Sequence, residues 1–107
     1  MPNTHEMIFK TLADPTRRAI YERLCRDGEL TVGALTAQAR VSQPAVSKHL
    51  GLLKRAGLVL DRPEGRQTHY AAQVGGLTPL VDWTSQMAGF WESRFDSLED
   101  LLKRMDQ

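Results

Sequence analysis

A short stretch in the middle of the chain carries side chains that are suited to contacting DNA bases. We assign seven of its residues to a candidate DNA-contact face: Ser42, Gln43, Pro44, Ala45, Ser47, Lys48 and His49. Glutamine can form two hydrogen bonds with adenine, lysine can reach guanine or a phosphate, and small side chains let a helix enter the major groove. The alternative is a capped, solvated helix start, and periodicity alone does not separate the two.

The spacing of apolar residues predicts the helix that carries this face. Val46, Leu50 and Leu53 recur at i, i+4 and i+7, as expected for a buried stripe. Ser42 is a typical N-cap, at a helix end where backbone N–H groups favour a phosphate, and Gly57 is a typical stop. For His49, beside the stripe, packing and a phosphate hydrogen bond both stay open.

A shorter helix is predicted directly before this one. Thr31 can cap it, with Val32, Leu35 and Ala39 directed inward, and residues 40–41 form a tight turn to the next helix. Two short helices joined in this way make a helix-turn-helix.

After Gly57 the pattern changes to short β-type runs at residues 58–60 and 68–71. The charged, turn-forming residues between them predict a two-stranded hairpin whose tip carries Arg62 and Arg66. Arginines at such a tip can enter a minor groove or bind phosphate. These two residues and Lys54 complete our ten candidate DNA-contacting residues.

Charge is divided unevenly along the 107 residues, although the net charge is only +1. Residues 1–60 carry +4, residues 61–76 are balanced, and residues 77–107 carry −3. Residues 40–69 hold six basic and two acidic side chains and coincide with the proposed helix-turn-helix and hairpin. A polyanion partner, double-stranded DNA, therefore fits the first two thirds of the chain.

The remaining segments complete a mainly α fold with a small β-hairpin. Asn3 or Thr4 can cap a first helix, and Asp14 followed by Pro15 starts a second. Thr78 starts a long last helix that reaches about Met105. We thus predict one domain over residues 1–107, a winged helix-turn-helix of about five helices and a two-stranded wing.

The last helix has an apolar surface wider than one core requires. The small domain could use this whole face as core, or line a pocket with it, but we favour a homodimer interface formed by residues 1–13 and 77–106. Its candidate residues are Ile8, Phe9, Leu80, Met87, Trp91, Leu98 and Leu101.

These motifs together resemble the ArsR/SmtB family across nearly the whole chain. They comprise residues 12–18, residues 42–50 with Leu53, residues 56–59, and Gly65–Arg66 with Tyr70. The resemblance implies a bacterial, dimeric winged-helix repressor that binds operator DNA, with its DNA-reading helix at residues 42–53 and its wing at residues 58–72.

The family's metal ligands are missing from their expected positions. Thr31 and Gly33 stand where many relatives carry two cysteines, and residues 77–107 contain no histidine. We therefore expect no metal site and no cofactor. The single cysteine, Cys25, is expected to be a small buried apolar residue, and no pattern typical of an enzyme stands out.

Two functions from different classes fit the sequence. The first is a dimeric, sequence-specific regulator that represses transcription from a palindromic operator; the alternative is a winged-helix module that contacts proteins. No apolar run is long enough for a membrane span and the amino terminus lacks a signal peptide, so we expect a cytoplasmic protein. Neither the operator sequence nor an effector can be read from these residues.

Overall fold

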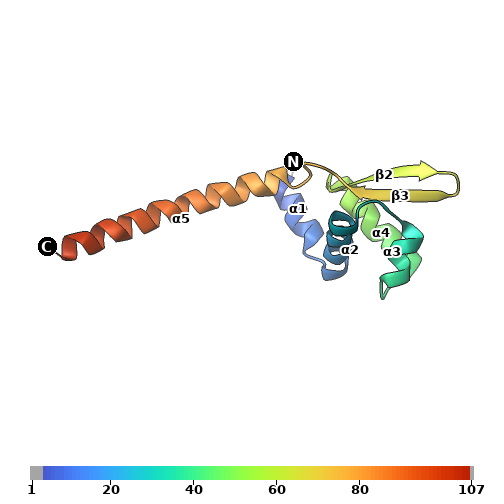
Figure 1. Cartoon of the computed structure of the whole chain (residues 1–107), viewed down its shortest axis with the longest axis horizontal. Helices are drawn as coiled ribbons and strands as arrows, with labels where there is room; N and C mark the ends of the chain where they lie inside the picture. Colours follow the sequence, from blue (N-terminus) through green and yellow to red (C-terminus); the bar gives the residue numbers. More distant parts are fainter. Residues whose placement is uncertain (1–3, 107) are drawn as a thin grey trace. The chain divides into compact units, whose positions relative to one another are not determined.

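The computed structural model describes residues 4–106, which form five helices and three short strands (Figure 1). In chain order these are α1 (Thr4–Leu12), α2 (Pro15–Asp27), β1 (Leu30–Thr31), α3 (Val32–Gln38), α4 (Gln43–Arg55), β2 (Val59–Glu64), β3 (Gln67–Ala72) and α5 (Thr78–Met105). One compact unit ends at Leu77 and the second, which is α5, begins at Thr78. The described residues confirm the predicted fold class, five helices with a wing.

Side-chain caps determine where three of the helices begin. The backbone N–H of Arg17 donates to Asp14 Oδ1 at 2.9 Å, and this bond is the main reason that the pKa of Asp14 lies below its ordinary value. Thr31 caps α3 and Ser42 caps α4 in the same manner, through bonds of 3.1 and 3.3 Å to backbone N–H groups. Each cap satisfies a donor that the helix itself cannot pair. The alternative cap of α1, Asn3, lies outside the described residues.

One apolar core holds α1 to α4 and the base of the sheet together. Its fully buried side chains are Ile8, Leu24, Leu35, Val46, Leu50, Leu53, Leu58 and Val59. The predicted stripe of α4 is therefore core. Ile8 is 0% exposed, which corrects its place among the interface candidates, because a residue without exposed surface has nothing to offer a partner.

The three strands form one antiparallel sheet in the order β1-β3-β2. The sequence predicts only the hairpin of β2 and β3; β1 adds a third strand by pairing Leu30 with Tyr70 and Thr31 with His69. β2 and β3 pair from Val59 opposite Ala72 to Glu64 opposite Gln67, so the connecting turn is Gly65–Arg66 alone. Gly65 has a φ of 62°, which a type II′ turn requires at its first central position. Arg62 lies within β2, opposite His69, and its predicted place at the tip is wrong.

After β3, the backbone around Gly76 packs closely against residues 57–58. The N–H of Gln73 donates to the carbonyl of Leu58 at 2.9 Å, and the N–H of Gly76 donates to the carbonyl of Gln73 at 3.0 Å. A Cβ atom on Gly76 would lie 2.7 Å from the Gly57 carbonyl oxygen. The backbone of Gly76 thus lies in close contact with that of Gly57.

Cys25 also departs from its prediction, because the structure leaves it exposed. It lies one helical turn after Tyr21, which is buried. Burial raises the pKa of Tyr21 to about 12, and a hydrogen bond with Cys25 is the second cause.

Candidate nucleic-acid interface

The first turns of α4 present the predicted DNA-contact face to solvent. Ser42, Gln43, Pro44, Ser47 and Lys48 are all exposed, and Ala45 is half-buried. On the opposite side the stripe of α4 is completely buried, so the helix cannot rotate without exposing the core. The fold therefore holds this face outward.

A polar groove brings part of α4 together with the wing. It has a volume of about 430 Å³ and is lined by Thr31, Val32, Gly33, Gln43, Ser47, Arg66, Gln67, Thr68 and Tyr70. We call it the wing groove. Three of our candidates, Gln43, Ser47 and Arg66, converge there from segments about twenty residues apart in the chain. The other seven candidates do not line this groove.

Arg62 is held by two glutamates rather than presented freely. Its guanidinium donates to Glu29 Oε1 and, at 3.1 Å, to Glu64 Oε2. The hydrogen bond from Arg62 is the main cause that lowers the pKa of Glu29, and the bond to Glu29 is the main cause that raises the pKa of Arg62. A phosphate that binds Arg62 would compete with these two carboxylates.

His69 belongs to the same cluster. Its Nδ1 lies 3.3 Å from Glu29 Oε1 and its Nε2 lies 3.3 Å from Glu64 Oε2. The side chain of His69 is only 21% exposed. The two carboxylates lie on opposite sides of the ring.

Two further candidates, Lys54 and His49, differ in how freely their side chains can contact DNA. Lys54 Nζ lies 3.0 Å from Asp61 Oδ1, an ion pair between the end of α4 and the start of β2. His49 is half-buried, and its Nδ1 is buried with no hydrogen-bond partner in the described chain. A charge interaction with His49 is a lesser cause of the lowered pKa of Asp14.

Among the four cationic candidates, Lys48 and Arg66 have no acidic partner within the described residues. Both are exposed, one on α4 and one at the wing turn. Free cations can neutralise phosphate without first breaking an ion pair, so these two residues are the strongest electrostatic contributors on this face.

Six groove residues are not among the candidates from the sequence, and three of these are Gln67, Thr68 and Tyr70. These three lie on β3, beside β1, whose pairing brings residues 30–31 against residues 69–70. A strand of two residues leaves almost no periodic pattern, so the only available sign was the polar composition of residues 67–70.

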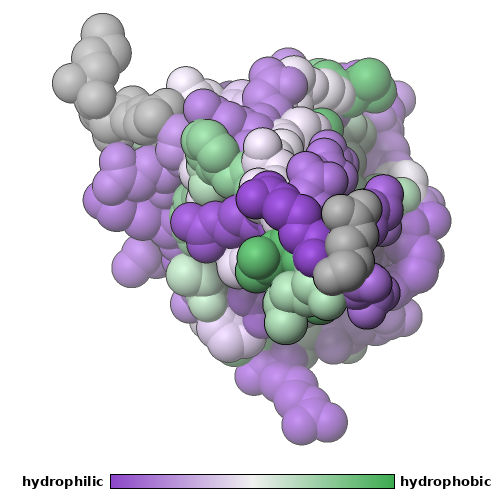
Figure 2. Space-filling model, turned by 90° about the vertical axis from the view of Figure 1, so that its left-hand side faces the viewer, coloured by the Kyte–Doolittle hydropathy of each residue, from purple (hydrophilic) through white to green (hydrophobic). Residues whose placement is uncertain are grey.

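α5 forms a separate unit with a long apolar face. No residue of this helix is buried. Its most exposed large apolar side chains are Val81, Phe90, Trp91, Phe95, Leu98, Leu101, Leu102 and Met105, each at least half exposed. Figure 2 shows hydrophobic surface lying open beside strongly hydrophilic surface. We call this set of eight residues the α5 apolar face.

Two ring contacts lie within α5. The rings of Trp91 and Phe95 lie 6.4 Å apart, and the Arg94 guanidinium lies 5.3 Å from the centre of the Trp91 ring. Of the interface candidates, Trp91, Leu98 and Leu101 are exposed, Leu80 and Met87 are half-buried, and Phe9 on α1 is 41% exposed.

Within residues 4–106 no cluster of His, Cys, Asp or Glu has the arrangement of a metal site. Thr31 and Gly33 line the wing groove and offer a hydroxyl and a bare backbone there. No helix among the described residues is long and apolar enough to cross a membrane.

Comparison with known proteins identifies the family. Residues 12–62, from the end of α1 into β2, match a family described as a helix-turn-helix domain. The HTH-type transcriptional regulator Rv2034 of Mycobacterium tuberculosis is 47% identical over 87 residues, which cover 77% of this chain and 80% of that protein. The transcriptional repressor SdpR of Bacillus subtilis is 33% identical over 76 residues, which cover 71% of this chain and 83% of that protein.

Solved structures extend the likeness beyond the helix-turn-helix. The crystal structure of an ArsR family transcriptional regulator matches with a TM-score of 0.78 at 33% identity, covering 87% of this chain and 95% of its own. The order of helices and strands and the presence of a wing agree with the family to which these relatives belong. The chain belongs to the ArsR/SmtB family of winged helix-turn-helix transcriptional regulators, and is thus a regulator rather than an enzyme.

Proposed function

We propose that this chain is a homodimeric repressor that binds a palindromic operator with α4 and the wing. The observation that carries the proposal is the wing groove, where Gln43 and Ser47 of α4 meet Arg66 of the wing turn. A base-pairing side chain and a phosphate-binding side chain on one surface can fix both the sequence that is read and the register of the protein on DNA. The similarity to a protein named as a transcriptional repressor supports repression rather than activation.

In this proposal the ten candidates take unequal roles. Gln43 contacts a base edge in the major groove, while Ser42, Ser47, Lys48 and Arg66 hold phosphates or sugars. Pro44 and Ala45 provide a small surface against the groove floor. Lys54, Arg62 and His49 act indirectly, because their polar atoms are paired or half-buried in the protomer.

We propose the α5 apolar face as the homodimer interface, with Phe9 of α1 as its companion. Trp91, Phe95, Leu98, Leu102 and Met105 follow one another at spacings of three or four residues. A stripe of this kind on a helix of 28 residues is self-complementary when two copies pack together. Trp and Met are enriched in the centre of such interfaces.

Dimerisation would give the DNA-contact face its specificity. A winged-helix dimer holds two reading helices about one DNA turn apart, roughly 34–36 Å or a multiple of that distance. One short helix reads few bases, whereas two copies read a symmetric site. We place this activity in the cytoplasm, together with the DNA that it regulates.

A mobility-shift assay on the DNA upstream of the chain's own coding sequence tests DNA binding. We expect a complex that survives excess unrelated DNA and is lost on a fragment with a scrambled palindrome. Absence of any shift at micromolar protein, together with capture of a protein partner through the wing, would favour the interaction-module alternative.

Dimerisation is tested by sedimentation velocity with circular dichroism as the control for folding. Leu98→Asp and Trp91→Ala should yield monomers with unchanged helicity in the first unit and much weaker operator binding. Ser85→Asp places the same charge on the opposite side of α5 and should leave the dimer intact. A wild-type protein that stays monomeric at tens of micromolar would refute both the dimer and the palindromic operator.

A further inference from the structure

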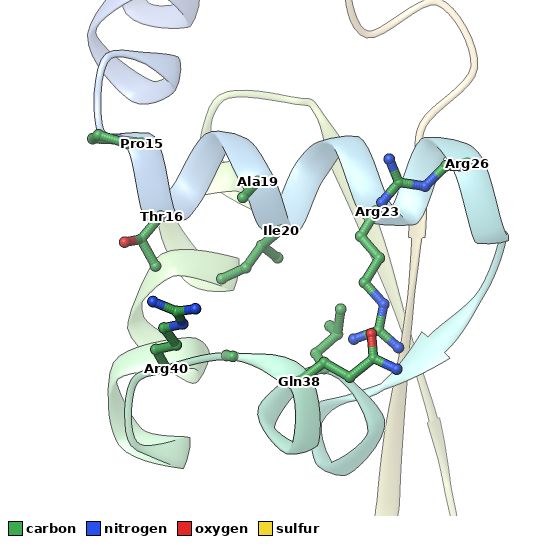
Figure 3. Close-up of a pocket in the computed structure, with 10 residues that line it drawn as sticks. Pro15, Thr16, Ala19, Ile20, Arg23, Arg26, Gln38 and Arg40 are labelled. Atoms are coloured by element: carbon green, nitrogen blue, oxygen red, sulfur yellow. The ribbon is translucent and has the colours of Figure 1, made fainter.

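A cavity lies between α2 and the segment that joins α3 to α4, away from the wing groove. Its volume is about 410 Å³, within the range of small-molecule sites. The lining residues are Pro15, Thr16, Ala19, Ile20, Arg23, Arg26, Leu35, Gln38, Ala39 and Arg40 (Figure 3). Nothing in the proposed DNA contact uses this cavity. We call it the α2–α3 cavity.

The cavity has an apolar floor and a cationic rim. Ile20 and Leu35, at the floor, are 5% and 2% exposed, and Ala19 and Ala39 extend this apolar surface. In Figure 3 the Arg40 side chain rises toward Thr16 on α2, while Arg23 descends from α2 toward Gln38, with Ile20 between them. The lining includes three arginines and no acidic residue.

The arginines are incompletely neutralised. Arg23 and Arg26 share a single carboxylate, Asp27, at 3.4 and 3.8 Å. The Nε of Arg23 is buried and has no hydrogen-bond partner among the described residues, although another of its nitrogens donates to the Ala34 carbonyl at 3.1 Å. Arg40 has no acidic partner in the part of the chain that the structure describes. The carboxylate of Asp27 is thus the one negative charge paired with any of these three arginines in the described chain, so the rim of the cavity keeps a net positive charge.

From this combination we propose that the α2–α3 cavity is a binding site for a small amphipathic carboxylate. The acid group would pair with Arg40, whose planar guanidinium matches a carboxylate in two parallel hydrogen bonds. An apolar body of about six to ten carbon atoms would cover Ala19, Ile20, Leu35 and Ala39. A bare inorganic anion lacks the body, and a neutral amphiphile lacks the charge.

The position of the cavity links such a ligand to the DNA-contact face. Arg40 lies two residues before the N-cap of α4, in the short segment that sets α4 against α3. A carboxylate on Arg40 removes a positive charge from the start of the helix-turn-helix, so DNA affinity falls when the site is filled. This consequence rests on the proposed DNA binding, whereas the binding site itself does not.

The site is tested first without DNA, by calorimetric titration of the full-length protein with octanoate. We expect saturable binding of octanoate, with octanamide and inorganic phosphate each binding at least about tenfold more weakly. Arg40→Gln should weaken octanoate by about 10- to 100-fold, the usual effect of losing a charged hydrogen-bond partner. Arg55→Gln is the matched control, since Arg55 is exposed, has no ion pair in the described chain and lies outside the cavity.

A second measurement locates the ligand, because the α5 apolar face could also attract an amphiphile. Backbone amide shifts on octanoate addition should concentrate in residues 16–40, and Ala19→Trp, which fills the cavity, should abolish them without lowering the melting temperature. Shifts confined to residues 78–106, or equal binding by wild type and Arg40→Gln, would overturn the site. If octanoate binds here and DNA affinity does not fall, the site stands and the link to DNA is wrong.

Discussion

The salt dependence of DNA binding should be set by the cations that the fold leaves unpaired. Counting charges in the sequence predicts about six to ten phosphate contacts in a dimer and a loss of affinity of about 10³–10⁵ between 50 and 200 mM salt. The structure reduces this expectation. Lys54 is paired with Asp61, and Arg62 with two glutamates, so of the four cationic candidates only Lys48 and Arg66 are free within residues 4–106.

Two free cations in each protomer give four phosphate contacts in a dimer. The slope of log affinity against log salt should then be about −3.6, a loss of about 150-fold between 50 and 200 mM. Arg66→Gln removes two of the four contacts and should halve the slope to about −1.8, a loss of about 12-fold over the same range. Fluorescence anisotropy with a labelled operator fragment at five or six salt concentrations measures the slope directly.

Arg62→Gln is the informative comparison. It removes no phosphate contact, so the slope should be unchanged, although the two carboxylates left unpaired will lower the affinity itself. A wild-type slope of about −5.4, as expected for six phosphate contacts in a dimer, or an equal change of slope in Arg62→Gln and Arg66→Gln, would mean that Arg62 exchanges its glutamates for phosphate on DNA. The inference from the free protein would then be refuted.

Three other outcomes follow from named contacts. Gln43→Ala should relax base preference at one position in each half-site by about 1–3 kcal/mol, measured as competition between operator variants; an equal loss on all sequences would contradict a base contact. Gly76→Ala should destabilise the fold by about 1–3 kcal/mol in chemical denaturation, because its Cβ would lie 2.7 Å from the Gly57 carbonyl oxygen. Gly51→Ala, with open space around its Cβ, should be neutral or stabilising by up to about 1 kcal/mol. If Gly51→Ala were less stable than Gly76→Ala, the close contact at Gly76 would be contradicted. The pKa of Asp14 is lowered in the fold, so its ionised form stabilises the protein above the unfolded pKa, and this stabilisation disappears as pH falls through the folded value. Asp14→Asn keeps a capping acceptor without a titrating group, and its stability difference from wild type should therefore shrink between about pH 5 and pH 2.

Local sequence predicts most of the elements because their causes are local. Asp14, Thr31 and Ser42 cap helices through bonds to residues three positions ahead, and the stripe of Val46, Leu50 and Leu53 follows from helical periodicity alone. The exposure of Gln43, Ser47 and Lys48 follows from that stripe, since the opposite side of a helix must face outward. The limits of the long last helix are predicted correctly, whereas the first strand of the hairpin extends to Glu64, beyond its predicted end at residue 60.

What the tertiary structure decided depends on residues that are far apart in the chain. The bond from Arg62 to Glu29 spans 33 positions and turns a predicted phosphate contact into an internal ion pair. The short strand β1 completes the wing groove, and the contact of Gly76 with Gly57 fastens the end of the sheet to the core. The α2–α3 cavity likewise exists only where two helices meet. Periodicity and capping act over three or four residues, whereas ion pairing, strand pairing and cavity shape depend on the three-dimensional approach of segments, which no local pattern encodes.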